Sequence, residues 1–244
     1  MYLVSLVVVV LMSLAENISR VRERMATAAQ RSGRRLEEIV LMAVTKTVST
    51  PRIIEAYDSG IRVFGENRIQ EFAGKIEAVR NLPDAEWHMI GHLQTNKAAK
   101  AAELFQHIDS VDSVRLARKL NAATSELGKK LPVLIEINIG GEEAKSGVAP
   151  DSRELHELLN SEPDLPSLDF RGLMTVPPYS ESPAESRPYF RKMRELFADL
   201  SSRKLAAVQM NVLSMGMSHD FEVAIEEGAT CVRIGTAIFG ERRL

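Results

Sequence analysis

A lysine at the end of an apolar run is the residue of this sequence best suited to covalent chemistry. Residues 39–45 carry no charge and are followed directly by Lys46. Such a run is typical of a strand buried on both faces. Because side chains alternate along a strand, Lys46 shares a face with Met42 and Val44. Partial desolvation lowers the pKa of an ammonium group, so its amine can form a Schiff base. The alternative is a strand-end lysine that only extends to water.

Two segments near the end of the chain have the composition of a phosphate-binding loop. They read Ser-Met-Gly-Met-Ser at 214–218 and Arg-Ile-Gly-Thr at 233–236, and each follows or ends an apolar run. Glycine lets the backbone approach an anion closely, and hydroxyl groups add hydrogen-bond donors. The residues expected to contribute are Ser214, Gly216, Ser218, Gly235 and Thr236. The alternative is that both glycines only form tight turns.

The elements that must position these residues follow from the alternation of apolar runs and amphipathic segments. Strands are predicted at 39–45, 61–64, 87–90, 107–111, 132–138, 170–175, 210–214 and 230–234. Helices are predicted at 13–35, 49–60, 68–80, 97–105, 112–127, 151–160, 185–203 and 219–227. This alternation favours an α/β fold with one parallel sheet, and the number of strands favours a single-domain (β/α)8 TIM barrel. A doubly wound open sheet is the alternative, but no Gly-x-Gly-x-x-Gly follows the first strand.

Composition and charge narrow the classes of function. The 244 residues carry a net charge of −2, which argues against a nucleic-acid partner or a basic membrane-binding face. The single cysteine, Cys231, excludes an internal disulfide and indicates a reducing, cytoplasmic location. We expect no metal site.

The first twelve residues form an apolar extension ahead of the barrel, which is expected to span residues 13–244. This run is shorter than the about 20 residues of a membrane-spanning helix, and it lacks the basic start of a secretory signal. We expect translation to begin at Met12, so that the preceding residues are a start-site artefact. A genuine secretory or anchoring segment and a buried extra strand are the alternatives.

In a closed barrel, the last two strands lie beside the first, so Lys46 would be a neighbour of both glycine segments. An amine, a phosphate cradle and the cation Arg233 between them suit pyridoxal 5′-phosphate, with the ring nitrogen facing the arginine. Since arginine cannot accept a proton, the ring would stay unprotonated and would be a weak electron sink. The alternative for Arg233 is an ion pair with a carboxylate such as Glu222.

The sequence resembles the YggS/PROSC family of pyridoxal-phosphate homeostasis proteins. The motifs that carry the resemblance are Val-Thr-Lys-Thr at 44–47, Phe-Gly-Glu-Asn at 64–67, Trp-His-Met-Ile-Gly-His-Leu-Gln-Thr-Asn-Lys at 87–97, Lys-Ser-Gly at 145–147, Arg-Gly-Leu-Met at 171–174, Leu-Ser-Met-Gly-Met-Ser at 213–218 and Val-Arg-Ile-Gly-Thr-Ala-Ile-Phe-Gly at 232–240. The resemblance runs from about residue 14 to the end of the chain, whereas residues 1–11 have no counterpart. Arg68 departs from the tyrosine often found there.

The resemblance implies a barrel like the N-terminal domain of alanine racemase and a Schiff base on Lys46. It also implies cofactor contacts from Asn67, Ser214, Arg233, Gly235 and Thr236. Such proteins hold the cofactor without established catalytic turnover, so no catalytic residue is expected. We further expect a monomer, with apo forms of pyridoxal-phosphate enzymes as conceivable partners and no membrane or nucleic acid.

Two kinds of enzyme are the alternatives. A pyridoxal-phosphate racemase or decarboxylase needs a second acid or base opposite the lysine, for which His92 or Tyr179 would have to serve. In alanine racemase this group comes from an additional domain, for which the chain that ends at Leu244 leaves no residues. A class I aldolase would carry its lysine on a middle strand, but the sixth predicted strand offers only Arg171 and Thr175.

Overall fold

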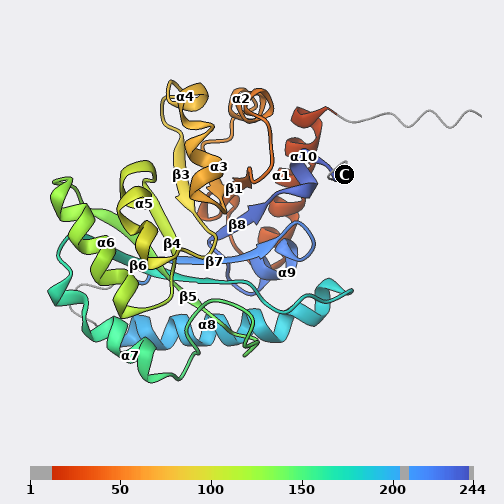
Figure 1. Cartoon of the computed structure of the whole chain (residues 1–244). Helices are drawn as coiled ribbons and strands as arrows, with labels where there is room; N and C mark the ends of the chain where they lie inside the picture. Colours follow the sequence, from red (N-terminus) through yellow and green to blue (C-terminus); the bar gives the residue numbers. More distant parts are fainter. Residues whose placement is uncertain (1–12, 204–208, 242–244) are drawn as a thin grey trace, which may run out of the picture.

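The computed structural model describes residues 13–203 and 209–241, and its strands close into a parallel barrel (Figure 1). Neighbouring strands pair in chain order, and β8 pairs with β1. The strands are β1 Val40–Val44, β2 Val63–Glu66, β3 Glu86–Met89, β4 His107–Val111, β5 Leu131–Ile137, β6 Leu168–Thr175, β7 Val212–Met217 and β8 Cys231–Ile234. The predicted eight-stranded barrel is therefore confirmed. The apolar residues 1–12 lie outside the described residues.

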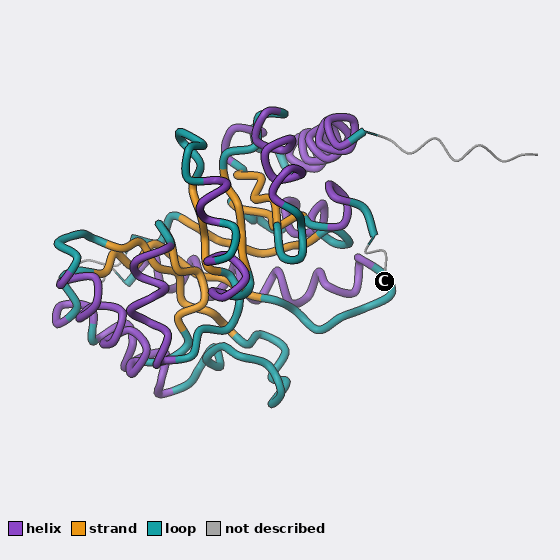
Figure 2. Tube along the Cα trace, turned by 45° about the horizontal axis from the view of Figure 1, so that its top comes forward, coloured by secondary structure: helices purple, strands orange, loops and turns teal. Residues whose placement is uncertain are grey.

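Helices alternate with the strands and surround the sheet (Figure 2). They are α1 Leu14–Arg31, α2 Thr50–Asp58, α3 Ile69–Ala73, α4 Ile76–Val79, α5 Ala98–Leu104, α6 Val114–Glu126, α7 Arg153–Asn160, α8 Arg187–Ser202, α9 Phe221–Glu226 and α10 Thr236–Phe239, with short 3₁₀ turns at Leu36–Glu38, Thr95–Lys97, Glu162–Asp164 and Pro183–Ser186. Among the described helices, none is both long and apolar enough to span a membrane.

The two ends of the described chain meet beside the same strands. Ser13 caps α1 in a reciprocal capping box with Glu16, which fixes the start of the helix. The apolar face of α1 packs against α9 and α10 (Figure 1). The Asn17 side-chain amide donates to the carbonyl of Ile238 over 3.0 Å. The first helix thus supports the strands β7, β8 and β1, where the sequence places the candidate site.

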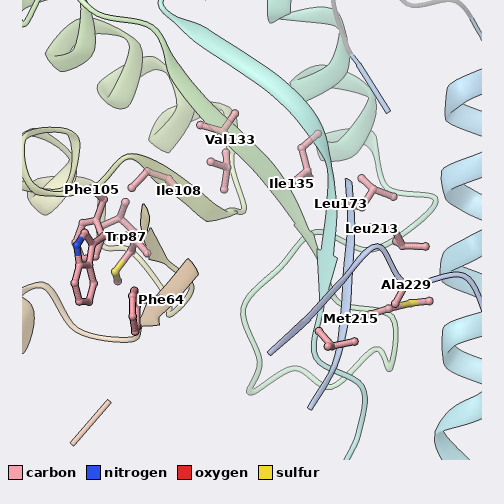
Figure 3. Packing of buried hydrophobic residues seen from close by; sticks show 14 of the residues in the cluster. Phe64, Trp87, Phe105, Ile108, Val133, Ile135, Leu173, Leu213, Met215 and Ala229 are labelled. Atoms are coloured by element: carbon pink, nitrogen blue, oxygen red, sulfur yellow. The ribbon is translucent and has the colours of Figure 1, made fainter. Parts of the chain in front are cut away.

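The hydrophobic core lies between the barrel and its helices. Many alternate strand residues, such as Ala43, Phe64 and Leu173, face outward and join one apolar cluster, of which Figure 3 shows part along β5, β6 and β7. Aromatic rings fill the sector outside β2 and β3: Trp87 stacks on Phe64 at 4.8 Å and packs against Phe72 at 4.7 Å between ring centroids. The alternate residues point into the barrel and include polar groups, which is how side chains for chemistry reach its interior.

Several predicted boundaries differ from the structure by a few residues, including the following three. The helix predicted at 68–80 is broken into α3 and α4 because Gly74 ends α3 and the side chain of Lys75 turns toward β1 and β2. The helix predicted at 185–203 begins with the 3₁₀ turn Pro183–Ser186. Strand β7 starts later and runs to Met217, so residues 215–217 belong to the strand and not to a loop.

Candidate functional site

Lys46 lies directly after β1 at the carboxyl end of the barrel. Its side chain is partly buried, as the alternation with buried Met42 and Val44 predicts. The next residue, Thr47, adopts a left-handed conformation with φ of 63°, which is unfavourable for a β-branched side chain. The Thr47 amide donates to Oε1 of Glu71 over 2.5 Å. This contact holds the backbone in the strained turn and so fixes where the Lys46 side chain begins.

A buried ion-pair network fixes the end of β1 beneath that turn. The Lys75 ammonium donates to the Thr45 carbonyl at 2.9 Å, and it pairs with Glu66 at 2.9 Å and Glu71 at 2.6 Å. The Thr45 hydroxyl donates to the same Glu66 oxygen over 2.8 Å. Burial raises the pKa of Glu66, and the contacts with Lys75 and Thr45 only partly oppose this rise. The sequence analysis did not assign these residues to the site, although Glu66 at the end of an apolar run was a detectable signal.

Arg233 lies inside the barrel on β8, where its side chain bridges strands. Only 3% of the residue is exposed, and it pairs in register with Met42 of β1. Its Nη1 donates to the Ser214 hydroxyl over 2.8 Å, and its Nη2 donates to the Thr175 carbonyl over 2.7 Å. The guanidinium group therefore has a fixed orientation in the barrel interior, between β8, β7 and β6.

The alternative ion pair between Arg233 and Glu222 is wrong. Glu222 instead accepts two hydrogen bonds from Arg24, from Nε at 3.1 Å and from Nη2 at 2.7 Å. Glu222 belongs to α9, which packs outside the barrel against α1. The two helices therefore satisfy this carboxylate without any group from the barrel interior.

Backbone amides converge at the end of β8. The amide N–H groups of Gly235 and Ala237 both donate to the Ser218 hydroxyl, over 3.1 and 3.3 Å. A Cβ added to Gly235 would lie 3.6 Å from Val44, so this loop is directly adjacent to the end of β1. Thr236 follows with an exposed side chain. The loop after β8 thus directs N–H groups at one oxygen atom close to the strand that carries Lys46.

Gly216 and Ser214 lie deeper than the sequence predicts. Gly216 has φ of 90°, and an added Cβ would lie 2.5 Å from Cβ of Ala224 and 3.0 Å from Cα of Phe221. Close packing of α9 therefore requires this glycine, independently of any ligand. Ser214 is fully buried in the middle of β7, and its hydroxyl accepts the hydrogen bond from Arg233. Contact of either residue with a cofactor stays a prediction.

Two further polar groups of this part of the barrel have unsatisfied atoms. Asn67 follows β2, and its Oδ1 is buried without a hydrogen-bond partner among the described residues. Glu136 on β5 is 7% exposed, and its Oε2 is likewise buried and unpaired within the described chain. Burial raises the pKa of Glu136, while a hydrogen bond from Ser146 opposes the rise. The sequence analysis missed Glu136, although a charge within the apolar run 131–137 was a signal.

The structure brings five of the predicted residues to three adjacent strands. Lys46, Asn67, Arg233, Gly235 and Thr236 lie on or directly after β1, β2 and β8, which pair with one another through β1. This arrangement can offer an amine, a fixed cation and convergent amide N–H groups to one small anionic ligand. Ser214, on β7, is connected to these five residues through its hydrogen bond with Arg233.

The two residues considered as a second acid or base are largely exposed. The side chain of His92 is 58% exposed, and its Nδ1 lies 3.2 Å from Asp112. Tyr179 is 86% exposed, and its ring packs near His219 with 6.3 Å between centroids. Neither side chain is enclosed in the barrel interior, where a positioned acid or base would meet the ligand beside Lys46.

Comparison with known proteins identifies the family. Residues 9–243 match the family described as alanine racemase, N-terminal domain. A pyridoxal phosphate homeostasis protein from Aquifex aeolicus (strain VF5) is 48% identical over 232 residues, which cover 95% of this chain and 100% of the relative. The structure of PipY from Synechococcus elongatus PCC7942 with PLP bound has a TM-score of 0.80 and 35% identity, covering 93% of this chain and 100% of PipY.

A more distant likeness concerns the fold alone. Alanine racemase from Clostridium difficile 630 is 18% identical, with a TM-score of 0.69, and the match covers 95% of this chain but 57% of the racemase. The barrel, the motifs and the high identity to a relative matched over its full length agree with one another. The chain belongs to the family of pyridoxal phosphate homeostasis proteins, which share the barrel of the alanine racemase N-terminal domain.

Proposed function

We propose that this protein binds pyridoxal 5′-phosphate through Lys46 and takes part in intracellular homeostasis of the cofactor without catalytic turnover. The observation that carries the proposal is the position of Lys46 directly after β1, next to the Gly235 loop of β8 and above the interior cation Arg233. When bound, the cofactor supplies an aldehyde, which condenses with a lysine amine to give a Schiff base and one water molecule.

The residues present fit this cofactor. The amides of Gly235 and Ala237 already converge on one oxygen atom, so they can donate to a phosphate oxygen together with the hydroxyls of Ser218 and Thr236. Arg233 is held rigidly by Ser214 and Thr175, and it can only donate to a ring nitrogen. An unprotonated ring withdraws electrons weakly, which suits storage of the cofactor better than carbanion chemistry. The unsatisfied Oδ1 of Asn67 gives a further polar contact beside the lysine.

The enzymatic alternatives receive less support. A racemase or decarboxylase needs a positioned second acid or base, and both His92 and Tyr179 are mostly exposed to water. A class I aldolase needs a lysine on a middle strand, and strand β6 contains none. We therefore infer a carrier or buffer located in the cytoplasm, a monomer that delivers its cofactor to apo pyridoxal-phosphate enzymes.

The absorbance spectrum of the purified protein tests the proposal. We expect a yellow protein whose visible band disappears after borohydride, with the reduced cofactor recovered on the peptide that contains Lys46. The variant Lys46→Ala should lose the colour, whereas Lys100→Ala, which alters an exposed lysine paired with Glu103, should keep it. Wild-type protein incubated with a panel of amino acids should leave them unracemised and undecarboxylated.

Two outcomes would contradict the proposal in different ways. If the protein never takes up pyridoxal 5′-phosphate, or if Lys46→Ala retains a band sensitive to borohydride, the binding site is misplaced. If the protein binds the cofactor through Lys46 but turns over an amino acid rapidly, the site is correct and the assignment as a carrier is wrong.

A further inference from the structure

A cavity opens at the end of the barrel opposite to Lys46. Its volume is about 250 Å³, and its lining includes the first residues of several strands, among them Val40 of β1, Val63 of β2, Glu86 of β3 and His107 of β4. Because parallel strands all start at the same end of a barrel, this cavity lies at the amino end of the strands. The proposed cofactor site lies at the carboxyl end, so the two sites are distinct.

Three groups that bind metals lie together in the wall of this cavity. Oε2 of Glu86 lies 3.6 Å from Nε2 of His107 and 3.9 Å from Nε2 of His88. One donor atom from each residue can be chosen so that all lie within 4.8 Å of one another. Bonds of about 2.0–2.1 Å to a tetrahedral Zn²⁺ place its ligand atoms roughly 3.3 Å apart. The two separations from Glu86 are therefore close to those of a metal site, and the three donor atoms need only a small movement to enclose an ion.

His88 has the environment of a metal-binding histidine. Its Nδ1 lies 3.1 Å from both carboxylate oxygens of Asp109, a residue that is 2% exposed. Its Nε2 is buried and lacks a hydrogen-bond partner among the described residues. A carboxylate that accepts from one ring nitrogen fixes the tautomer and directs the other nitrogen toward a metal, as in carboxylate–histidine–zinc triads. Asp109 and His88 show this arrangement at the cavity wall.

We propose that Glu86, His88 and His107 bind one divalent transition-metal ion of the Zn²⁺ class, with a fourth coordination position open to the cavity. Two imidazoles and one carboxylate suit Zn²⁺, and open zinc sites commonly have three protein ligands. The hard cations Mg²⁺ and Ca²⁺ prefer sites made of oxygen ligands and fit this set poorly.

Binding requires a small local rearrangement. The rings of His88 and His107 stack at 4.0 Å with an angle of 6° between their planes, so one ring must tilt before both Nε2 atoms point at one ion. Binding also releases the proton from Nε2 of His88, because only an unprotonated ring nitrogen is a ligand. His107 and Glu86 can move, because their side chains are 25% and 55% exposed, whereas the 12% exposed His88 is held by Asp109. We therefore expect His88 to be the fixed ligand and the other two to close on the ion.

This site does not rest on the proposed cofactor function. The sequence leads us to expect no metal site. A local pattern does not reveal this one, because a helix separates Glu86 from His107 in the sequence and only the pairing of β3 with β4 places His107 beside His88. The cavity gives the ion access from solvent without passage through the barrel interior.

The test is a titration of the untagged full-length protein with Zn²⁺ in competition with a chromophoric chelator. We expect one equivalent to bind, with an affinity at least about tenfold weaker in Glu86→Gln and in His107→Gln. Asp109→Asn, which disturbs only the orienting contact, should weaken binding by about 10- to 100-fold. His156→Gln is the matched control, because His156 is exposed on α7.

Co²⁺ provides a second readout. Tetrahedral Co²⁺ absorbs strongly in the visible range, whereas Co²⁺ that stays surrounded by water at a nonspecific surface site absorbs weakly. Circular dichroism of each variant shows whether a loss of binding reflects unfolding, and Glu86→Gln keeps the shape of an exposed side chain. Lys46→Ala should bind Zn²⁺ as tightly as wild type does. Equal affinity in wild type, Glu86→Gln and His107→Gln, or binding lost only in Lys46→Ala, would overturn the proposal.

Discussion

Arg233 shows how a structural residue can also be held in position for the proposed ligand. A buried guanidinium is costly unless its N–H groups are satisfied, and here a hydroxyl and a carbonyl from two other strands accept from it. These contacts leave the cation in one orientation at the register position of Met42. Its proposed role toward a ring nitrogen therefore depends on geometry that these protein contacts already maintain, which would reduce the cost of ordering on binding.

Thr236 allows a test of the phosphate cradle without damage to the fold. Its side chain is exposed at the start of α10, so Thr236→Ala should leave stability unchanged. Loss of one hydroxyl donor should weaken retention of pyridoxal 5′-phosphate up to about tenfold, measured by equilibrium dialysis. Thr236→Ser keeps the hydroxyl and should restore retention. Equal retention in all three proteins would place the phosphate elsewhere.

Gly216 has a packing role that a stability measurement can test. Gly216→Ala should destabilise the protein because it combines a φ of 90° with a Cβ only 2.5 Å from Ala224. Gly33→Ala is the matched control, since Gly33 has φ of 69° with no atom near an added Cβ. We expect about 1 to 2 kcal/mol for Gly33→Ala, and about 1 to 3 kcal/mol more for Gly216→Ala, in urea unfolding. Similar losses for both would show that the overlap at Gly216 is easily relieved.

The sequence predicts some site residues better than others for a physical reason. Lys46 follows from strand periodicity, which depends only on neighbouring residues. The position of Ser214 was predicted at a strand end, but β7 continues to Met217, because its pairing with β8 sustains the strand past Gly216. Glu66 and Lys75 form their ion pair across elements, so no local pattern indicates it.

At the scale of elements, a broken helix supports the lysine-bearing strand. The split between α3 and α4 places Lys75 where its ammonium reaches the carbonyl of Thr45 and the buried carboxylate of Glu66. A continuous helix was predicted there, over residues 68–80. The competing tertiary interaction overrides local helix propensity.

Removal of the Lys75 ammonium group should lower the free energy of unfolding substantially. Lys75→Met leaves Glu66, whose side chain is 0% exposed, without its cationic partner, and we expect a loss of about 3 to 5 kcal/mol. Lys100→Met is the control, because its pair with Glu103 is about half exposed and should contribute less than about 1 kcal/mol. Urea unfolding measures both. A loss below 1 kcal/mol for Lys75→Met would mean that Glu66 becomes protonated at little cost.

At the scale of the whole molecule, the barrel has polar residues at both ends and an apolar core between its strands and the surrounding helices. The fold was predictable because the strands are mostly apolar runs and the longer connecting helices have one apolar face, and both patterns are local. The polar interior was not predictable, because which alternate side chains meet across the barrel depends on strand register. His88 and His107, from β3 and β4, meet only through that register.

The amino end of the barrel should control how stability depends on pH. Burial lowers the pKa of His88, but the charge and hydrogen bond of Asp109 and the contact with Glu86 outweigh it and raise the pKa to about 9. Burial and the charge of His88 lower the pKa of His107 to about 4. Both histidines have an ordinary pKa of 6.5, so the two shifts act in opposite pH ranges.

The direction of each pH effect on stability follows from the number of protons that the folded and unfolded states bind. The raised pKa of His88 gives stability that is fully present below pH 6.5 and is lost as the pH rises through about 9. The lowered pKa of His107 gives a contribution that is present above pH 6.5 and is lost as the pH falls through about 4. Each group should change the unfolding free energy by at most about 1.4 kcal/mol per pH unit within its range.

His107→Gln gives the cleaner test of this whole-molecule effect, because His88→Gln also removes a charge that lowers the pKa of His107. Urea unfolding is measured from pH 4 to pH 9 with a chelator present, so that metal binding does not contribute. His107→Gln should flatten the profile on the acid side of neutrality, His88→Gln should flatten the alkaline side, and the exposed control His156→Gln should follow wild type. If His107→Gln keeps the acid slope of wild type, carboxyl groups with lowered pKa values, such as Glu71 and Glu227, set that slope. The raised pKa values of Glu66 and Glu136 would instead make stability increase as the pH falls. The acid slope therefore distinguishes the histidine pair from the buried carboxylates by its direction as well as by its size.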